Sequence, residues 1–270
     1  MKSLQFPLVS VVTVVYNAKD ALSETLANVS KQGYANKEVI VIDGGSTDGT
    51  IKVIEENAPI ITNSVSERDY GIYDAMNKGI LRANGKWLIF MNAGDVFYSS
   101  DTLSNIFEKN SFDGFDVIYG KHVTNYGDYS YVNGQLAPLD SIWKKMPFSH
   151  QAVFCKTEWL KKRGFDTTYK VVADHDMMYE YYRGGAKFHF IDEVIAIASL
   201  GGVSDTHRIK SYRERLVFIR KYPSSTIKVL YFRCVLIKEY IFSFVKHILG
   251  QNVVARIVKV RNAVFREIED

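Results

Sequence analysis

Residues 9–50 read VSVVTVVYNAKDALSETLANVSKQGYANKEVIVIDGGSTDGT, and this stretch decides the fold of the chain. An apolar run ends at Asn17, a helical segment follows, and a second apolar run leads into an acidic, glycine-rich turn that starts at Asp43. The pattern predicts strand, helix and strand, with the two strands parallel. Ligands of open α/β sheets bind outside the carboxyl ends of the strands. Asn17 and Asp43 both come at that edge, which indicates a pocket for the base and ribose of a nucleotide.

Strand and helix patterns continue to alternate after this stretch, with short connections. They predict an α/β fold with a Rossmann-like, mostly parallel sheet flanked by helices. Residues 126–134 have the composition of a hairpin or loop. The expected strands are residues 8–16, 38–42, 59–62, 87–91, 117–119 and 188–198, and the expected helices are residues 20–32, 50–57 and 73–83.

The domain organisation follows from two changes of character along the chain. Residues 1–115 are expected to form a nucleotide-binding half, and residues 116–210 a second half that shares its core. Together they would make one domain, residues 1–210. From residue 211 to residue 270 the pattern is helical and basic, which predicts a C-terminal helical extension.

Composition narrows the class of protein. The chain has 270 residues, of which 47% are hydrophobic and 13% aromatic, enough for a sizeable core. The net charge of +4 is mild, whereas nucleic-acid binders show a concentrated basic face. Cys155 and Cys234 are the only cysteines, so neither a disulfide framework nor a metal cluster is expected. We see no signal peptide and no uncharged run of ~18 residues that would span a membrane, and expect a cytoplasmic protein.

Six blocks of sequence resemble glycosyltransferase family 2, in that family's order and spacing, over roughly residues 8–205. The blocks are residues 10–17, 41–50, 66–79, 85–87, 91–95 and 173–176. The resemblance implies a GT-A fold, a nucleotide-sugar donor and a role of the bacterial surface-polysaccharide type. The sequence departs from the family pattern twice: Asn92-Ala93-Gly94-Asp95 replaces an Asp-x-Asp motif, and Ala173-Asp174 replaces Glu-Asp.

A divalent metal is the first implied cofactor. Mg²⁺ or Mn²⁺ neutralises a leaving diphosphate and is held by one or two carboxylates together with the substrate. The resemblance makes Asp95 the ligand, and places Asn92, Ala93 and Gly94 beside the donor. Spacing alone favours a helix N-cap or turn aspartate for Asp95, and the ordered blocks favour the ligand.

The donor pocket is assigned by the same resemblance. Asp43 is expected to bind the base, and its alternative role is to stabilise the glycine turn that follows it. Asp69 and Lys78 are candidates for contact with ribose or diphosphate. The spacing of Asp74 and Lys78 leaves an internal ion pair as the alternative for Lys78. The backbone against the base is expected at Val15, Tyr16 and Asn17.

Asp174 is the candidate catalytic base, because it opens a helix beside an apolar stretch and can take a proton from a sugar hydroxyl. Its alternative role is a helix N-terminal charge favoured by the macrodipole, and Asp176 should point elsewhere on that helix. Polar side chains elsewhere are candidates for the acceptor pocket or for a loop over the diphosphate: His150, Gln151, His207 and Arg208. Of these, His207 is also a second candidate metal ligand.

The tail contains an apolar and aromatic run, residues 227–249, interrupted by basic side chains. Such a helix can lie in an anionic membrane interface. It can equally pack on the core or on a second subunit, so a homo-oligomer stays open. Membrane contact would place the protein on the inner face of the cell membrane.

The resulting hypothesis is an inverting, metal-dependent glycosyltransferase with a UDP-sugar as donor and a saccharide or lipid-linked saccharide as acceptor. A sugar-nucleotide nucleotidyltransferase is one alternative, disfavoured because no basic Gly-x-Gly loop follows the first strand. A non-catalytic nucleotide- or saccharide-binding protein on the same fold is another. Asn92 and Gly94 favour it, whereas Asp95 and Asp174 oppose it.

Overall fold

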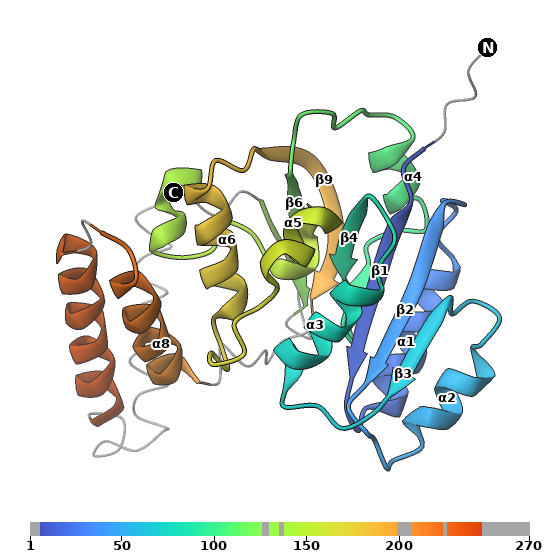
Figure 1. The fold of residues 1–270 in the computed structure, drawn as a ribbon, viewed down its shortest axis with the longest axis horizontal. Coiled ribbons are helices and arrows are strands. Elements are labelled where there is room, and N and C mark those ends of the chain that lie inside the picture. Colours follow the sequence, from blue (N-terminus) through green and yellow to red (C-terminus); the bar gives the residue numbers. More distant parts are fainter. Residues whose placement is uncertain (1–5, 126–129, 135–137, 199–206, 224–225, 245–270) are drawn as a thin grey trace. The chain divides into compact units, whose positions relative to one another are not determined.

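The computed structural model describes residues 6–125, 130–134, 138–198, 207–223 and 226–244. Contacts divide the chain into two compact units, Met1–Gly202 and Val203–Asp270, and each is treated by itself. The described residues of the first unit form one sheet of nine strands with helices on both faces (Figure 1). The predicted α/β class is confirmed.

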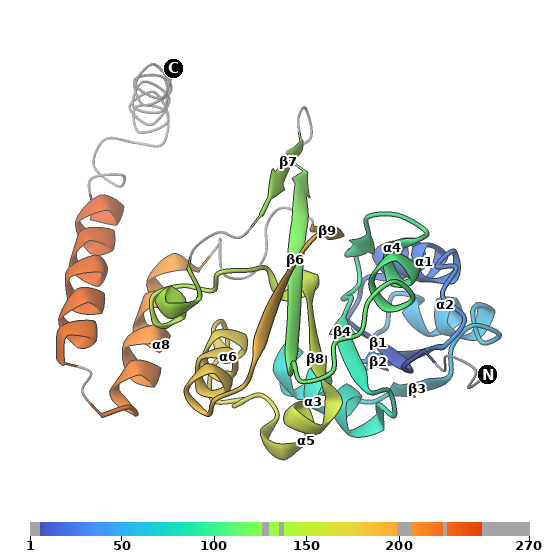
Figure 2. The same cartoon turned by 90° about the horizontal axis from the view of Figure 1, so that it is seen from above.

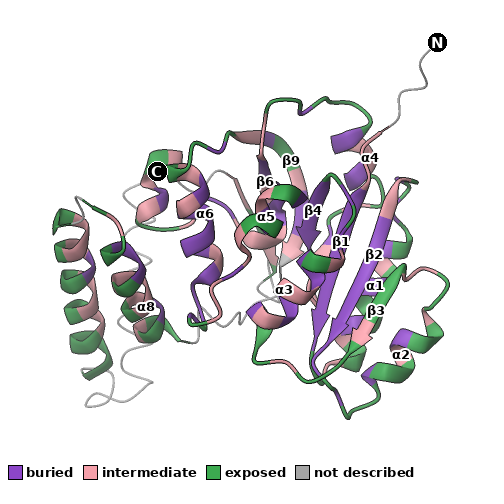
Figure 3. Cartoon of the chain, in the orientation of Figure 1, coloured by how far each residue is buried: buried purple, intermediate pink, exposed green. Residues whose placement is uncertain are grey.

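Four parallel strands form the first half of the sheet, in the order β3-β2-β1-β4. Every residue of β1 is buried (Figure 3), as expected for a parallel strand covered on both faces. Their bounds are β1 (Val9–Val15), β2 (Lys37–Asp43), β3 (Asn63–Ser66) and β4 (Trp87–Phe90).

The helices of this half are shared between the two faces. On one face lie α1 (Lys19–Ser30) and α2 (Thr50–Glu56), and on the other lie α3 (Ile72–Arg82) and α5 (Thr157–Arg163) (Figures 1 and 2). Helix α3 lies close to the sheet at Gly79, where a side chain would collide with Val12. The face of α1 toward the sheet buries Leu22, Leu26 and Val29.

Beyond β4 the sheet becomes mixed, in the order β8-β6-β9-β5. Strand β8 is antiparallel to both β4 and β6, whereas β9 runs parallel to β6. The hairpin composition at 126–134 is matched by β7, which pairs with β6; residues 126–129 lie outside the described residues. The bounds are β5 (Val96–Phe97), β6 (Val117–Asn125), β7 (Ser130–Asn133), β8 (Val153–Lys156) and β9 (Phe188–Ala198), with helices α4 (Thr102–Phe107) and α6 (Ala173–Arg183).

The third strand was predicted at residues 59–62, and this is wrong: β3 begins at Asn63. The apolar pair Ile60 and Ile61 instead packs, partly buried, against the core cluster. The backbone N–H of Thr62 donates to Val39 O at 2.8 Å, directly before the first pair of the ladder, Ile40 and Asn63. An edge strand pairs through its backbone on one side and tolerates polar, exposed side chains, so apolar content did not mark it.

The second unit contains α8 (Arg208–Arg220) and a helix over residues 226–244. The guanidinium of Arg208 pairs with Glu239 at 2.8 Å, and that of Arg213 lies 5.4 Å from the centre of the Tyr240 ring. These contacts join the two helices. The predicted helical extension is therefore confirmed in its described part.

Candidate functional site

The loops that follow β1 and β2 are fastened to each other at the carboxyl edge of the sheet. The backbone N–H of Asn17 donates to Ser46 Oγ at 2.7 Å, and the N–H of Thr47 donates to Asn17 Oδ1 at 2.8 Å. Asn17 has a φ of +47°, a conformation that asparagine tolerates better than most residues. Beside it Tyr16 is 64% exposed, so its ring is available to a ligand.

Asp43 is fully buried where β2 ends. Its Oδ2 accepts hydrogen bonds from Ser46 N at 3.0 Å, Gly45 N at 3.2 Å and Ser66 Oγ at 2.6 Å. Its Oδ1 accepts a further bond from Ser46 Oγ. The structure therefore shows the turn-stabilising role, and the contact with a base stays a prediction.

Asp69 lies at the same edge, against the turn after β2. A side chain on Gly44 would collide with the Asp69 carboxylate and lie 3.2 Å from the Tyr16 ring. Asp69 is itself fixed, because its Oδ1 accepts a bond from Gly71 N at 2.8 Å. The absence of a side chain at Gly44 thus lets Tyr16 and Asp69 approach each other, as a shared donor pocket requires.

Lys78 on α3 forms the ion pair with Asp74 that the sequence spacing allowed, and a second ion pair with Glu67. Its Nζ lies 2.9 Å from Glu67 Oε1 and 3.6 Å from Asp74 Oδ2. Burial lowers the pKa of Lys78, but the hydrogen bond that Lys78 donates to Glu67 and the charges of both carboxylates outweigh it, so the pKa is raised. Lys78 Nζ also donates to the backbone oxygen of Arg68 at 3.1 Å, so this cation is held in place, and its contact with a donor stays a prediction.

The turn Asn92–Asp95 follows β4 and is anchored by α1. Thr25 Oγ1 accepts from Gly94 N and donates to Asp95 O, both at 2.9 Å. Asp95 is only 6% exposed. Burial raises its pKa to about 6, although the charge of His150 and a hydrogen bond from Gln151 lower it. A buried carboxylate in this state is stabilised by a nearby cation.

His150 and Gln151 join this turn, which their position in the sequence did not show. Gln151 Nε2 donates to Asp95 Oδ1 at 3.3 Å, and His150 Nε2 lies 3.4 Å from Asn92 Nδ2. Within the described residues, Asn92 Oδ1 is buried without a hydrogen-bond partner. These four residues form one polar cluster, called here the Asp95 cluster.

His122 on β6 was not among the site residues predicted from the sequence. It is buried, and its pKa is lowered by burial and by the charge of His150. A single histidine in an apolar strand carries no signal of a site. Its relation to the Asp95 cluster arises only when β6 enters the sheet.

Asp174 stands half-buried in the first turn of α6. Its Oδ1 accepts from His175 N at 2.9 Å and lies 3.2 Å from the hydroxyl of Tyr73, which comes from the first turn of α3. Asp176 is fully buried and pairs with Arg163 at 2.6 Å. The two carboxylates therefore point apart, and Asp174 is the one directed toward the helix that carries Lys78.

His207 and Arg208 belong to the second unit. His207 precedes α8, and Arg208 forms the ion pair with Glu239. The roles of both residues toward acceptor or metal stay predictions.

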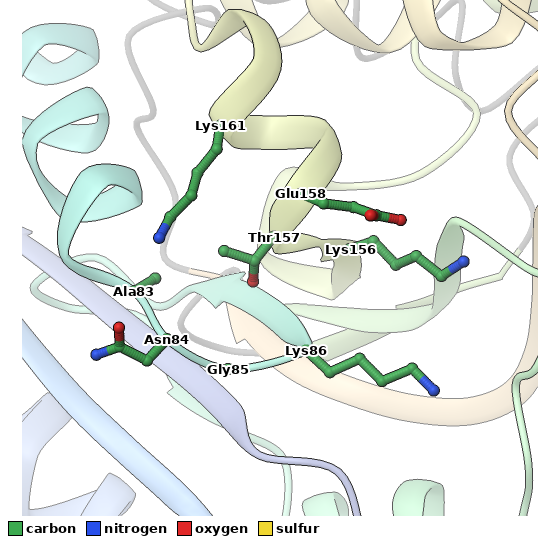
Figure 4. A pocket seen from close by; sticks show the side chains of 8 residues that line it. All are labelled: Ala83, Asn84, Gly85, Lys86, Lys156, Thr157, Glu158 and Lys161. Carbon is green, nitrogen blue, oxygen red and sulfur yellow. The ribbon is translucent and has the colours of Figure 1, made fainter.

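A cavity of about 470 Å³ lies at the opposite edge of the sheet, where β4 begins and β8 ends (Figure 4). Lys161 reaches across it toward Ala83, while Lys86 and Lys156 are directed away to pair with Asp113 and Asp116. None of the predicted site residues lines it. This cavity is therefore separate from the candidate site.

The residues present fit a metal held mainly by substrate. No group of three histidine, cysteine, aspartate or glutamate side chains in the described part of the chain is arranged to hold a metal. Within the Asp95 cluster, the carboxylate of Asp95 is buried, and Asn92 Oδ1 is buried without a hydrogen-bond partner. Mg²⁺ sites of this kind use one or two carboxylates plus phosphate oxygens and water.

Comparisons with known proteins identify the family to which the chain is similar. The model of the family described as "Glycosyl transferase family 2" matches residues 10–171. A PGL/p-HBAD biosynthesis glycosyltransferase of Mycobacterium bovis is 27% identical over 249 residues, 85% of this chain and 96% of that protein. An uncharacterized glycosyltransferase of Mycobacterium tuberculosis is 30% identical over 223 residues, 77% of this chain and 79% of that protein.

Two solved structures share the fold. The mannosyltransferase PcManGT from Pyrobaculum calidifontis, in complex with GDP-Man and Mn²⁺, has a TM-score of 0.62 at 21% identity, over 85% of this chain and 70% of that one. S. aureus TarS 1–349 in complex with UDP has a TM-score of 0.64 at 20% identity, over 89% of this chain and 73% of that one.

The different surroundings of the two α6 carboxylates predict different effects on stability. Asp176→Asn removes one partner of a buried ion pair, and we expect a loss of about 3 kcal/mol in the free energy of unfolding, at the low end for such pairs because Arg163 keeps Glu180 at 2.8 Å. Asp174→Asn should lose less than about 1 kcal/mol, since its bonds survive the change. Urea unfolding of both variants measures this, and equal losses would contradict the assignment.

Proposed function

Because the chain belongs to glycosyl transferase family 2, we propose that it transfers a sugar, with inversion, from a UDP-sugar to a saccharide or lipid-linked saccharide in surface-polysaccharide synthesis. The observation that carries this is that β3, β2, β1 and β4 are neighbouring parallel strands, so the segments that follow them, with Tyr16, Asp69 and Asp95, leave the sheet at one edge. The side chains of Tyr16 and Asp69 both lie next to Gly44. Asp95 lies in the turn after β4, the strand on the other side of β1. Asp174 is directed toward α3, the helix that follows Asp69.

The donor pocket is formed by the loops after β1 and β2. The exposed ring of Tyr16 offers a surface on which a base can stack, with the backbone of Val15 and Asn17 beside it. Asp69 and Lys78 stand where ribose and diphosphate would follow. The neighbouring turn contributes Ala93 and Gly94 next to Asn92. A UDP complex among the solved neighbours supports UDP, and the GDP-Man complex makes GDP the alternative.

Asp95 is the residue that would hold a divalent cation, Mn²⁺ or Mg²⁺, and Asn92 would add an amide oxygen. When bound, the cation supplies positive charge next to the diphosphate as it leaves. The buried Asp95 carboxylate fits this role better than a turn role, since its backbone oxygen, not its side chain, makes the bond to Thr25. His207 is the second candidate ligand from the chain.

Asp174 acts as the general base in this proposal. It takes the proton of the acceptor hydroxyl while that oxygen forms a bond to the anomeric carbon. The bond from this carbon to the diphosphate oxygen breaks on the opposite side, so the configuration inverts and the nucleoside diphosphate leaves. Tyr73 orients the carboxylate, because its hydroxyl lies 3.2 Å from Asp174 Oδ1.

The acceptor pocket is assigned to the side of the Asp95 cluster formed by His150 and Gln151. These polar side chains contact Asn92 and Asp95 and so border the reacting end of the donor. His207 and Arg208 stay candidates for contact with the diphosphate or the acceptor.

The function is tested by incubating the protein with UDP-, GDP- and dTDP-sugars and Mn²⁺ or Mg²⁺. We expect slow hydrolysis that releases nucleoside diphosphate, with UDP-sugars the best donors. Release of pyrophosphate from a sugar phosphate and a nucleoside triphosphate would instead identify a nucleotidyltransferase. Binding of nucleotides without any turnover would identify a non-catalytic binding protein.

The metal role of Asp95 predicts a specific binding defect. Mn²⁺ should increase the affinity of the wild-type protein for UDP, and a chelator should abolish turnover. Asp95→Asn should retain the metal-free affinity for UDP but lose the increase with Mn²⁺, because an amide is a weaker ligand for a hard cation. Calorimetry measures both affinities, and full turnover in chelator would overturn the metal assignment.

The base assignment predicts a loss of turnover without a loss of binding. Asp174→Asn keeps the shape of the side chain but cannot take a proton, so kcat should fall on the order of 100-fold or more while UDP affinity stays unchanged. Asp113→Asn, an exposed change at the opposite edge of the sheet, is the matched control and should leave kcat intact. A wild-type kcat for Asp174→Asn would remove it from the mechanism.

A further inference from the structure

One face of helix 226–244 is apolar and open to solvent. The large hydrophobic side chains on this face are between 58% and 81% exposed. The thiol of Cys234 lies among them and is exposed as well. They recur every three and four residues, so they line one side of the helix. This face, called the tail stripe, consists of Ile227, Leu230, Cys234, Ile237, Ile241 and Phe244.

The opposite side of the same helix is already occupied. Phe232 is fully buried, and Glu239, seven residues on, is held by Arg208 of α8. At the helical period of 3.6, these two residues lie across the helix from Leu230, Ile237 and Ile241. The tail stripe is therefore not the face with which this helix packs inside the second unit.

Among the described residues, no helix is both long enough and apolar enough to span a membrane. An apolar stripe along one side of a helix fits a helix lying along a surface, with its apolar side down.

Charge selects the kind of surface. Residues 203–270 contain 14 lysines and arginines against 6 aspartates and glutamates, so this unit has a net charge of +8, whereas the whole chain has +4. The two charged side chains that flank the tail stripe, Arg233 and Lys238, are both basic and exposed. If two copies paired through the stripe, these like charges would face each other and repel. An anionic lipid surface offers the complementary charge to both.

We propose that the tail stripe seats the protein on an anionic lipid membrane. The helix lies parallel to the surface, its apolar side chains enter the boundary of the acyl chains, and Arg233 and Lys238 meet the lipid phosphates. This surface goes beyond the proposed function and does not depend on it, because lipid binding requires neither donor nor turnover.

The two cysteines allow a direct test on the full chain. Cys155 is buried, and burial raises the pKa of its thiol, whereas Cys234 lies exposed in the stripe. A thiol-reactive, polarity-sensitive fluorophore should therefore label Cys234 selectively. On addition of vesicles that contain phosphatidylglycerol, its emission should shift to the blue and gain intensity, and rising salt should reverse the change. Vesicles of phosphatidylcholine alone should have little effect.

Two pairs of double variants distinguish binding through the tail stripe from nonspecific binding of other exposed residues to lipid. Ile237→Ser with Ile241→Ser should lower the affinity for anionic vesicles about tenfold or more, because apolar burial supplies part of the binding. Leu81→Ser with Val217→Ser, which changes two exposed hydrophobic residues outside the stripe, should not. Arg233→Gln with Lys238→Gln should weaken binding at low salt, whereas Lys31→Gln with Lys52→Gln should not.

Several outcomes would overturn the proposal. One is an emission spectrum that anionic vesicles do not change. Another is a blue shift that grows with protein concentration in the absence of lipid, together with a dimer in sedimentation that Ile237→Ser with Ile241→Ser dissolves, since the stripe would then join two copies. Donor hydrolysis is measured without lipid, so failure of the enzymatic proposal would be seen separately. Circular dichroism checks that each variant is folded.

Discussion

The parallel ladder that joins β1 to β2 and to β4 is the constraint on which the rest of this structure depends. Its register sets Val15 opposite Asp43 and Val12 opposite Phe90, so three chain segments leave the sheet at one edge. Two bonds between Asn17 and residues 46–47 then fasten the first two loops together. A shift of one residue in this register would turn every side chain of β1 to the other face and would separate the groups assigned to the donor.

Asp43 and Asp95 are two buried carboxylates at this edge, and they differ in the groups that stabilise their negative charge. A carboxylate removed from water must receive hydrogen bonds or positive charge. Asp43 receives bonds from backbone N–H groups and two serine hydroxyls, so the protein itself satisfies it. Asp95 receives a long bond from Gln151, a backbone bond at Asn92 and the charge of His150, and burial outweighs them and raises its pKa. The first arrangement stabilises a turn, whereas the second is the one that we propose to hold a cation. Burial alone therefore does not identify a functional carboxylate, and its partners decide.

The sequence predicted what depends on local pattern and missed what depends on packing. The apolar runs of β1, β2 and β4 and the glycine turn after β2 have local signals, and they fixed the parallel half. Strand β3 is polar and was placed four residues too early, because an edge strand needs backbone pairing rather than apolar content. The bond between Tyr73 and Asp174 spans 101 positions of the chain, and the Asp95 cluster unites segments 56 and 58 positions apart. Contacts of this range leave no trace in residue spacing.

The proposal requires that the nucleotide bind at the carboxyl edge of β1, β2 and β4. Hydrogen exchange of the backbone amides, measured on the full chain with and without UDP and Mn²⁺, shows where it binds. We expect slower exchange in residues 15–17, 44–49, 69–71 and 92–95, and unchanged exchange around the opposite cavity at residues 84–86 and 156–161. Protection confined to the opposite cavity, with no change at the carboxyl edge, would exclude the proposed donor pocket.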